Sequence, residues 1–257
     1  MLTPPEIARS LLAAGESKAR LPLGKMLLLA ILAGAYIALA GVGATAAAVT
    51  VESGSLAKLL SACVFPAGLS MVILAGAELF TGNCLMVMAL LERRITPAQL
   101  LRNWLTVYLG NAVGGAAVAA LAVYSHTASL FGDGLARSMV SIAESKAALG
   151  FGDAFLRGVL CNFLVCLAVW MAAASKRAEG KVIALFFPIL LFVLCGYEHC
   201  IANLYYLPAG AFAAAEYGME TTLTLAGCLK NLAAVTLGNL VGGAALGVGY
   251  RFAYLKE

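Results

Sequence analysis

The sequence predicts an all-helical integral membrane protein with six transmembrane helices, arranged as a 3+3 inverted repeat in which the second and fifth helices are broken. The first observation behind this prediction is composition: of 257 residues, 62% are hydrophobic and 12% charged, and the mean hydropathy is +0.94. A soluble domain is about 45 to 50% apolar and about 25% charged. This chain therefore has too few polar side chains to cover a surface in water. The second observation is an internal repeat.

Stretches without a charged side chain are long enough for six crossings, because a spanning helix needs about 20 mainly apolar residues. These stretches are 26–51, 59–77 continued by 79–91, 103–132, 158–175, 182–197 continued by 199–215, and 231–250. Glu78 interrupts the second crossing and Glu198 the fifth, each in a glycine-containing segment.

The positive charges predict the orientation, since Lys and Arg concentrate in cytoplasmic segments. With both termini inside, 12 of the 17 Lys and Arg residues are cytoplasmic: Arg9, Lys18, Arg20, Lys25, Arg93, Arg94, Arg102, Lys176, Arg177, Lys181, Arg251 and Lys256. We expect a multi-pass protein of the prokaryotic plasma (inner) membrane with cytoplasmic termini. The first span has full membrane length and no suitably placed cleavage site, so we expect no signal peptide.

Two pairs of segments repeat within the chain. Residues 101–116 align without gaps on 229–244 and share Leu-Gly-Asn-x-Val-Gly-Gly-Ala, while 75–83 matches 195–203. Each half then contains three crossings, and because three is odd, the halves enter the membrane from opposite sides. Interrupted helices in matching positions of two inverted halves indicate a transport site near the midplane.

The repeat divides the chain into five predicted segments. These are an N-terminal cytoplasmic segment (1–25), a first three-helix repeat (26–132), an outer connecting loop (133–152), a second repeat (153–253) and a C-terminal tail (254–257). Apolar and charged residues alternate from Pro4 to Leu21, which favours an amphipathic helix at the interface or over the pore.

The two break carboxylates, Glu78 and Glu198, need local donors, because a charge at a helix centre costs about 2.5 to 3.5 kcal/mol. We expect each to cap the free N–H groups of the following half-helix. A cation-binding or proton-carrying role is the alternative. Unwound backbone at membrane depth must face protein or a polar cavity, so both breaks should face inward, unless Gly76 and Gly196 serve only close helix packing.

His199 is the histidine expected near mid-membrane, beside the second break, where a neutral ring can donate a hydrogen bond and a charged ring can pair with an anion. Thr81 offers a hydroxyl in the matching break. From the residues alone, buried asparagines such as Asn162 and Asn239 are expected to join helices. His126, by contrast, is expected to be an ordinary residue of the outer connection.

Four separated motifs occur along the chain: Glu-Leu-Phe-Thr-Gly at 78–82, the run from Gly158 to Trp170, Gly-Tyr-Glu-His-x-x-Ala-Asn at 196–203, and Leu-Gly-Asn at 237–239. Together and in this order they resemble the formate/nitrite transporter family, and the resemblance covers nearly the whole chain. Tyr197 and the run 158–171 are closer to nitrite-type or hydrosulfide-type members than to formate-type ones.

This resemblance implies an aquaporin-like fold and a symmetric homopentamer in which each protomer has its own pore. By the same resemblance, His199 is the central pore histidine, Thr81 its partner, and Lys146 a loop lysine that attracts anions, while Asn162 and Asn239 are polar pore residues. The resemblance further implies two apolar constrictions around the histidine, formed by Phe65, Leu69, Leu79, Val165 and Phe192.

The predicted function is a transmembrane channel or transporter for small monovalent anions such as nitrite, formate or hydrosulfide, with His199 assisting anion passage or protonation. Burying a bare carboxylate-sized ion in a low-dielectric medium costs of order 20 kcal/mol. The anion therefore needs compensating donors or a proton in order to cross. The partners that we expect are small anions, protons, the lipid bilayer and further copies of the chain.

The alternative is a pore for neutral solutes such as water or ammonia, although the breaks lack paired Asn-Pro-Ala elements. An enzyme is not expected, because the chain has neither His-Glu-x-x-His nor a Gly-x-Ser-Gly nucleophile. Cys195, His199 and Cys200 have unconvincing metal-ligand spacing, so we expect no metal and no cofactor. No basic, aromatic-rich face indicates a nucleic-acid partner.

Overall fold

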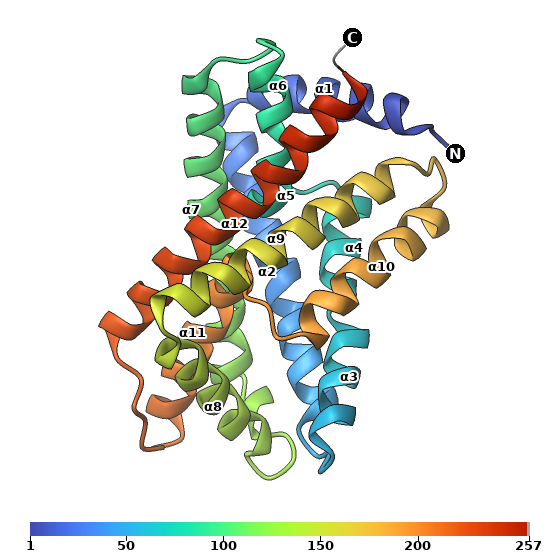
Figure 1. Cartoon of the computed structure of the whole chain (residues 1–257). Helices are drawn as coiled ribbons and strands as arrows, with labels where there is room; N and C mark the ends of the chain where they lie inside the picture. The colour runs from blue at the N-terminus through green and yellow to red at the C-terminus, as the bar shows by residue number, and fades with distance from the viewer. Residues whose placement is uncertain (256–257) are drawn as a thin grey trace.

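The computed structural model describes residues 1–255, and within that range the regular elements are all helices, with no strand. Figure 1 shows the long helices crossing at the centre of the molecule and both termini at the same end. The helices are α1 (Pro4–Ala19), α2 (Leu23–Ala48), α3 (Gly54–Val64), α4 (Pro66–Ala75), α5 (Phe80–Asn83), α6 (Val87–Leu91), α7 (Pro97–Tyr124), α8 (Gly134–Ala148), α9 (Phe151–Ala173), α10 (Ala178–Leu194), α11 (Cys200–Glu216) and α12 (Leu225–Tyr254). Two short 3-10 turns, η1 (Cys84–Met86) and η2 (Thr127–Ser129), complete the described part.

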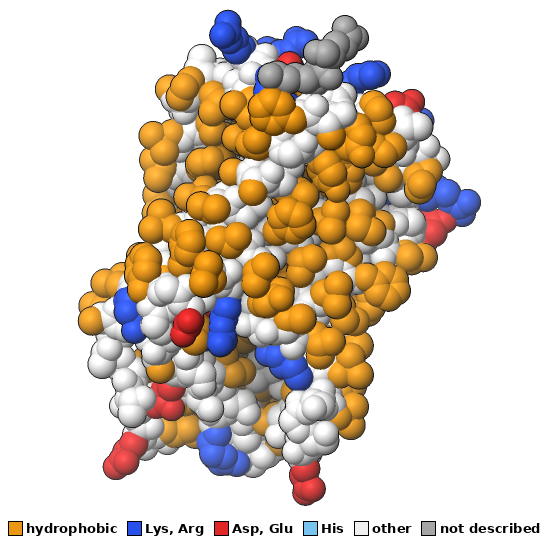
Figure 2. Space-filling view, in the orientation of Figure 1, with side chains coloured by type: hydrophobic (Ala, Val, Ile, Leu, Met, Phe, Trp, Pro, Cys, Tyr) orange, Lys and Arg blue, Asp and Glu red, His pale blue; other side chains and the backbone are white. Residues whose placement is uncertain are grey.

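Several helices are long and apolar enough to cross a bilayer. Within the described residues these are α2, the pair α3 and α4 (Gly54–Ala75), α7, α9 and α12. Hydrophobic side chains cover the middle of the molecular face in Figure 2, and charged side chains lie mainly toward its two ends. Such an apolar exposed belt belongs in lipid. The chain is therefore a multi-pass membrane protein.

The second predicted stretch is less regular than its apolar sequence suggests. A bend at Phe65 separates α3 from α4, because Pro66 at the start of α4 has no N–H to continue the ladder of the preceding helix. A wider interruption between Ala75 and Phe80 separates α4 from α5. The sequence predicts the second interruption but not the first.

Two helices lie outside the predicted crossings. The N-terminal stretch forms α1, which begins at a capping box between Thr3 and Glu6. The segment 133–152, expected as a connecting loop, contains the 15-residue helix α8. This helix forms because Leu135, Met139 and Val140 have helical spacing and pack against the same cluster as α11.

The C-terminal helix α12 continues to Tyr254, so the predicted tail begins inside a helix. Lys256, which contributed to the predicted orientation, and Glu257 lie outside the described residues.

The repeated glycine element allows two pairs of long helices to touch. A Cβ at Gly114 on α7 would lie 2.0 Å from the carbonyl oxygen of Ile31 on α2. A Cβ at Gly242, its repeat mate on α12, would lie 2.0 Å from the carbonyl oxygen of Val159 on α9. Only glycine permits such backbone contact. The same element therefore brings α7 against α2 and α12 against α9.

Candidate functional site

Two helix interruptions lie at the centre of the molecule. Helix α4 ends at Gly76, whose φ of 79° is left-handed, and α5 begins at Phe80 after an extended Leu79. Helix α10 is likewise followed by Gly196, with φ 69°, before α11 begins at Cys200. Glycine adopts this backbone conformation without a Cβ penalty. The paired glycines thus permit the helix ends at both breaks.

Buried asparagines satisfy the backbone groups freed by the breaks. At the first break, Asn111 Oδ1 accepts from the Phe80 N–H at 3.0 Å, and its Nδ2 donates to the Glu78 carbonyl oxygen at 2.9 Å. Its Nδ2 also donates to the carbonyl oxygen of Ala30 on α2, at 2.7 Å. One amide thus joins α7 to both the break and a neighbouring helix.

The second break has the matching arrangement. Asn239 Oδ1 accepts from the Cys200 N–H at 2.8 Å, while its Nδ2 donates to the carbonyl oxygens of Glu198 at 2.9 Å and Gly158 at 2.8 Å. Asn162 Nδ2 donates in turn to the Asn239 carbonyl oxygen at 2.7 Å. Both asparagines are fully buried, and their amide N–H groups donate to backbone carbonyls, as expected for residues that join helices.

The first break carboxylate is paired with the N-terminal helix. Lys18 Nζ on α1 lies 2.6 Å from Glu78 Oε1, and Asn83 Nδ2 donates to Glu78 Oε2 at 2.8 Å. The Glu78 side chain is 7% exposed and that of Lys18 is 30% exposed. Helix α1 therefore contributes a cation to the interior of the protein, which no motif in the sequence indicated.

The second break carboxylate is paired with the helix in the connecting segment. Lys146 Nζ on α8 lies 2.9 and 3.0 Å from the two Glu198 oxygens, and Asn203 Nδ2 donates at 2.7 Å. The expectation that the carboxylates cap the half-helices is therefore corrected. The side-chain oxygens of Asn111 and Asn239 already accept the first N–H groups of α5 and α11. A buried carboxylate is stabilised more by a nearby cation than by a neutral donor.

His199 and Thr81 face each other between the two breaks. The Nδ1 atom of His199 accepts from the N–H of Ala202 at 3.1 Å, and Nε2 lies 2.9 Å from Thr81 Oγ1. An accepting Nδ1 is unprotonated, so hydrogen bonding assigns the proton of the neutral ring to Nε2. Nε2 then donates to Thr81 Oγ1. This leaves the Thr81 hydroxyl hydrogen available to donate to a solute.

A small apolar space adjoins this pair. We call it the central chamber: it measures about 10 Å³ and is lined by Ile37, Phe65, Leu69, Leu79, Val165, Ile189, Phe192 and His199. All five apolar residues named from the family resemblance are in this set. Ile37 and Ile189 were missed, because in the sequence they are two apolar residues among many in long apolar helices.

Two larger cavities share walls with the central chamber. The Lys146 vestibule, about 390 Å³ and lined by Lys58, Lys146, Arg157 and Glu198 among others, shares Phe65, Phe192 and His199 with it. The α1 vestibule, about 320 Å³ and lined by Lys18 and Glu78 among others, shares Leu69 and Leu79. Three cavities therefore adjoin one another within the chain, with the smallest in the middle.

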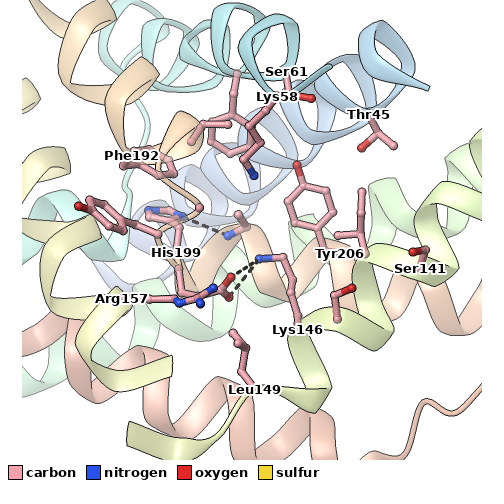
Figure 3. A pocket seen from close by; sticks show the side chains of 18 residues that line it. Thr45, Lys58, Ser61, Ser141, Lys146, Leu149, Arg157, Phe192, His199 and Tyr206 are labelled. Atoms are coloured by element: carbon pink, nitrogen blue, oxygen red, sulfur yellow. Dashed lines mark hydrogen bonds and ion pairs between the residues drawn. The ribbon is translucent and has the colours of Figure 1, made fainter. Parts of the chain in front are cut away.

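Figure 3 shows the cationic side of the Lys146 vestibule. The side chains of Lys58 from α3 and Arg157 from α9 extend toward the space beside Lys146. Both are among the five Lys and Arg residues that the sequence analysis did not assign to the cytoplasm, and neither was given a role. Their convergence depends on how α3, α8 and α9 pack, which no local motif specifies.

The family model for formate/nitrite transporters matches residues 5–253. The chain belongs to the formate/nitrite transporter family. It is 38% identical to a protein named probable formate transporter from Methanothermobacter thermautotrophicus, over 99% of this chain and 98% of the relative. It is 39% identical to the formate channel FocA of Haemophilus influenzae, over 86% of this chain and 83% of the relative.

Two solved structures of the family have the same fold. An FNT family ion channel matches with a TM-score of 0.87 at 32% identity, over 96% of this chain and 98% of that chain. A pentameric formate channel with formate bound matches with a TM-score of 0.80 at 33% identity, over 91% of this chain and 98% of that chain. These matches are consistent with an aquaporin-like membrane fold. The relatives are named transporters or channels, which is consistent with a protein that is not an enzyme.

The subtype is not resolved by these relatives. The sequence favoured nitrite-type or hydrosulfide-type members, whereas the relatives described above are named for formate.

Proposed function

We propose that this family member is a pore for small monovalent anions such as formate, nitrite or hydrosulfide. The main observation is the His199–Thr81 pair, the polar contact beside a chamber otherwise lined by apolar side chains. The vestibule on each side of the chamber contains a lysine paired with a carboxylate. Cations at both mouths and an apolar centre suit a solute that arrives as an anion and crosses with its charge neutralised.

The proposed architecture has six crossings in two inverted halves. The fifth crossing combines α10 and α11, which have 17 residues each and are separated by the break at Gly196. Matching hydrogen bonds of Asn111 and Asn239 support the repeat. Both termini lie at one end in Figure 1, as an even number of crossings requires, and we assign that end to the cytoplasm.

The proposed assembly is a homopentamer in a prokaryotic plasma membrane. It is supported by the likeness to a solved pentameric formate channel. The relatives from Methanothermobacter thermautotrophicus and Haemophilus influenzae support a prokaryotic transporter of this kind. Each protomer would have its own pore, because the three cavities lie within a single chain.

The hydrogen bonds of His199 limit its chemistry. A neutral ring that gave up its Nε2 proton would become an imidazolate, and a charged ring would have to break the contact from the Ala202 N–H to Nδ1. The ring is therefore better suited to orient Thr81 than to protonate the solute. We propose that the anion takes a proton from solvent in a vestibule, and that Thr81 donates a hydrogen bond to it beside the chamber.

Flux into proteoliposomes tests this function. Formate, nitrite and hydrosulfide are supplied in parallel, with and without a pH gradient, to the wild type, His199→Phe and the control His126→Phe. We expect the wild type and His126→Phe to take up the anions faster as the outer pH falls, because the anion takes its proton from solvent. In His199→Phe we expect a large loss of this uptake, because Thr81 loses the Nε2–H that orients it. Unchanged uptake rate and selectivity in His199→Phe would refute the proposed role of the ring.

A neutral-solute pore is the second candidate, because the central chamber is small and largely apolar. Such a pore would conduct water or ammonia at rates that formate and nitrite do not reduce. Competition by these anions would favour the anion pore, since neutral solutes do not depend on the lysine-containing vestibules.

A further inference from the structure

The two vestibules differ in charge. Among the described residues, the Lys146 vestibule is lined by three cationic side chains (Lys58, Lys146 and Arg157) and one carboxylate (Glu198). The α1 vestibule is lined by one cation, Lys18, and one carboxylate, Glu78. The first cavity therefore has two formal positive charges in excess, and the second has none.

The excess charge comes from side chains without an ion-pair partner. Glu198 is paired with Lys146, at 2.9 Å. Within residues 1–255, neither the Lys58 nor the Arg157 side chain has a carboxylate within ion-pair distance or a hydrogen-bond acceptor. Figure 3 shows both of them extending into the vestibule with Lys146. An ammonium and a guanidinium thus face the same space with their donors unused by the protein.

We propose that Lys58, Arg157 and Lys146 form a binding site for a tetrahedral oxyanion with two negative charges, such as inorganic sulfate, in the Lys146 vestibule. This inference rests on the proposed function and extends it to an anion that binds but does not pass. A dianion gains twice the Coulomb attraction of a monovalent ion at each cation. Arg157 can hold two of its oxygens at once, as guanidinium groups do with oxyanions.

The same dianion is excluded from the central chamber. The Born cost of entering a low-dielectric space grows with the square of the charge, so it is about four times that of a monovalent ion. Phe65 and Phe192, whose ring centroids are 5.7 Å apart, separate the vestibule from the chamber. Bound sulfate would therefore occupy the entry route of formate and inhibit transport from this side only.

The site is tested by formate efflux from proteoliposomes at about 10 mM ionic strength, where the Debye length is about 30 Å. Sulfate is added outside in one series and loaded inside in another. External protease cleaves an N-terminal tag and so reports the fraction of molecules with α1 outward. A molecule whose tag is protected has α1 inside and the Lys146 vestibule outside. We expect external sulfate to inhibit only these molecules. Equal inhibition of both orientations would overturn the proposal.

Charge-removing variants identify the site. Lys58→Gln/Arg157→Gln should raise the half-inhibiting sulfate concentration at least about tenfold, because two cations facing a dianion are lost. The control Arg137→Gln/Lys230→Gln removes the same charge from residues outside this vestibule, and should change the concentration less than about twofold. An unchanged value in the first variant, or an equal change in the control, would contradict the site.

Direct binding separates this inference from the proposed function. Equilibrium dialysis of radiolabelled sulfate against the full-length wild type in nanodiscs should show saturable binding that Lys58→Gln and Arg157→Gln each weaken. If the wild type binds sulfate in this way but transports no anion, the proposed function fails and the site stands. If formate flux occurs without saturable sulfate binding, the site fails alone. Should the double variant not fold, the two single variants provide the same comparison.

Discussion

Thr81 Oγ1 lies 2.9 Å from His199 Nε2, although 118 positions separate the two residues in the chain. Each lies where a helix resumes after a break: Thr81 is the second residue of α5, and His199 is the residue immediately before α11. The contact therefore joins the two helix breaks at the centre of the molecule. A different contact places the proton of the neutral ring on Nε2, because the Ala202 N–H donates to Nδ1.

Replacing Thr81 by valine should reduce anion flux. Valine keeps the shape but removes both the acceptor for His199 Nε2–H and the donor available to a solute. Leaving one buried polar group unpaired costs about 1 to 3 kcal/mol, so we expect a reduction of about 5-fold to 150-fold in stopped-flow formate uptake. Thr81→Ser restores the hydroxyl and should recover most of the flux. Wild-type flux in Thr81→Val would contradict the role of the hydroxyl.

Removing Lys18 should destabilise the protein through Glu78. In Lys18→Met, Glu78 keeps Asn83 as a donor but loses its countercharge, and breaking a buried ion pair in this way costs about 3 to 5 kcal/mol. Because the Lys18 side chain is 30% exposed, solvent screening should place the loss at or below the lower end of this range.

The measurement is a double-mutant cycle of thermal unfolding in nanodiscs. Lys18→Met should lower the melting temperature more than Lys18→Met/Glu78→Gln does, since the second change removes the unpaired charge. Additive effects of the two changes would show that the pair is not coupled.

A methyl group at Gly242 should separate α12 from α9. The added Cβ would lie 2.0 Å from the Val159 carbonyl oxygen, a backbone atom that cannot move aside. We expect Gly242→Ala to destabilise the protein by about 1 to 3 kcal/mol or more, as overpacking does. The matched control is Gly249→Ala on the same helix, where nothing lies within 4 Å of the added atom.

The control should be neutral or stabilising, because alanine favours helix more than glycine by about 1 kcal/mol. Thermal unfolding of both variants, measured side by side, distinguishes the two effects. A melting temperature for Gly242→Ala at or above that of Gly249→Ala would show that the close approach of the two helices is not needed.

The contact between α8 and the segment before α12 should weaken in acid. The N–H of Thr222 and the hydroxyl of Thr221 donate to Glu144 Oε1 at 2.7 and 2.9 Å, and these hydrogen bonds lower the pKa of the Glu144 carboxyl below its usual 4.5. A lowered folded-state pKa means that the stabilisation is present above the unfolded-state pKa and is lost as the pH falls through the folded-state value.

Amide hydrogen exchange at Thr222 measures this effect. Protection should be greater at pH 6 than at about pH 3 in the wild type, after correction for the intrinsic exchange rate. In Glu144→Gln the difference should disappear, because the glutamine amide does not titrate. Equal corrected protection at the two pH values in the wild type would contradict the assignment.

Long stretches without charged residues made most of the long helices predictable. Apolar stretches of membrane length correspond to α2, α7, α9 and α12, and the break near Glu78 was expected from a carboxylate beside glycine in an apolar run. The bend at Pro66 was missed because a proline at a helix start and one at a bend have the same local sequence. Helix α8 was missed because its polar composition suggested a loop.

The sequence predicted which residues belong to the site better than it predicted which residues they contact. The sequence singled out Glu78 and Glu198 but indicated the wrong partners, since capping is a local interaction and the observed partners, Lys18 and Lys146, are 60 and 52 positions away. Lys58 and Arg157 received no role because nothing in the chain near them indicates the cavity that they line.

The sequence by itself determined that this chain belongs in a membrane and that its helices are interrupted near Glu78 and Glu198. Hydrophobicity, glycine placement and an internal repeat act along the chain and can be recognised without coordinates. The tertiary structure alone decided which groups meet: that Thr81 faces His199, that each buried carboxylate has a lysine, and that one vestibule is more cationic than the other. These contacts depend on the packing of helices remote in sequence, because ion pairs and hydrogen bonds need atoms within a few ångströms whatever their separation along the chain.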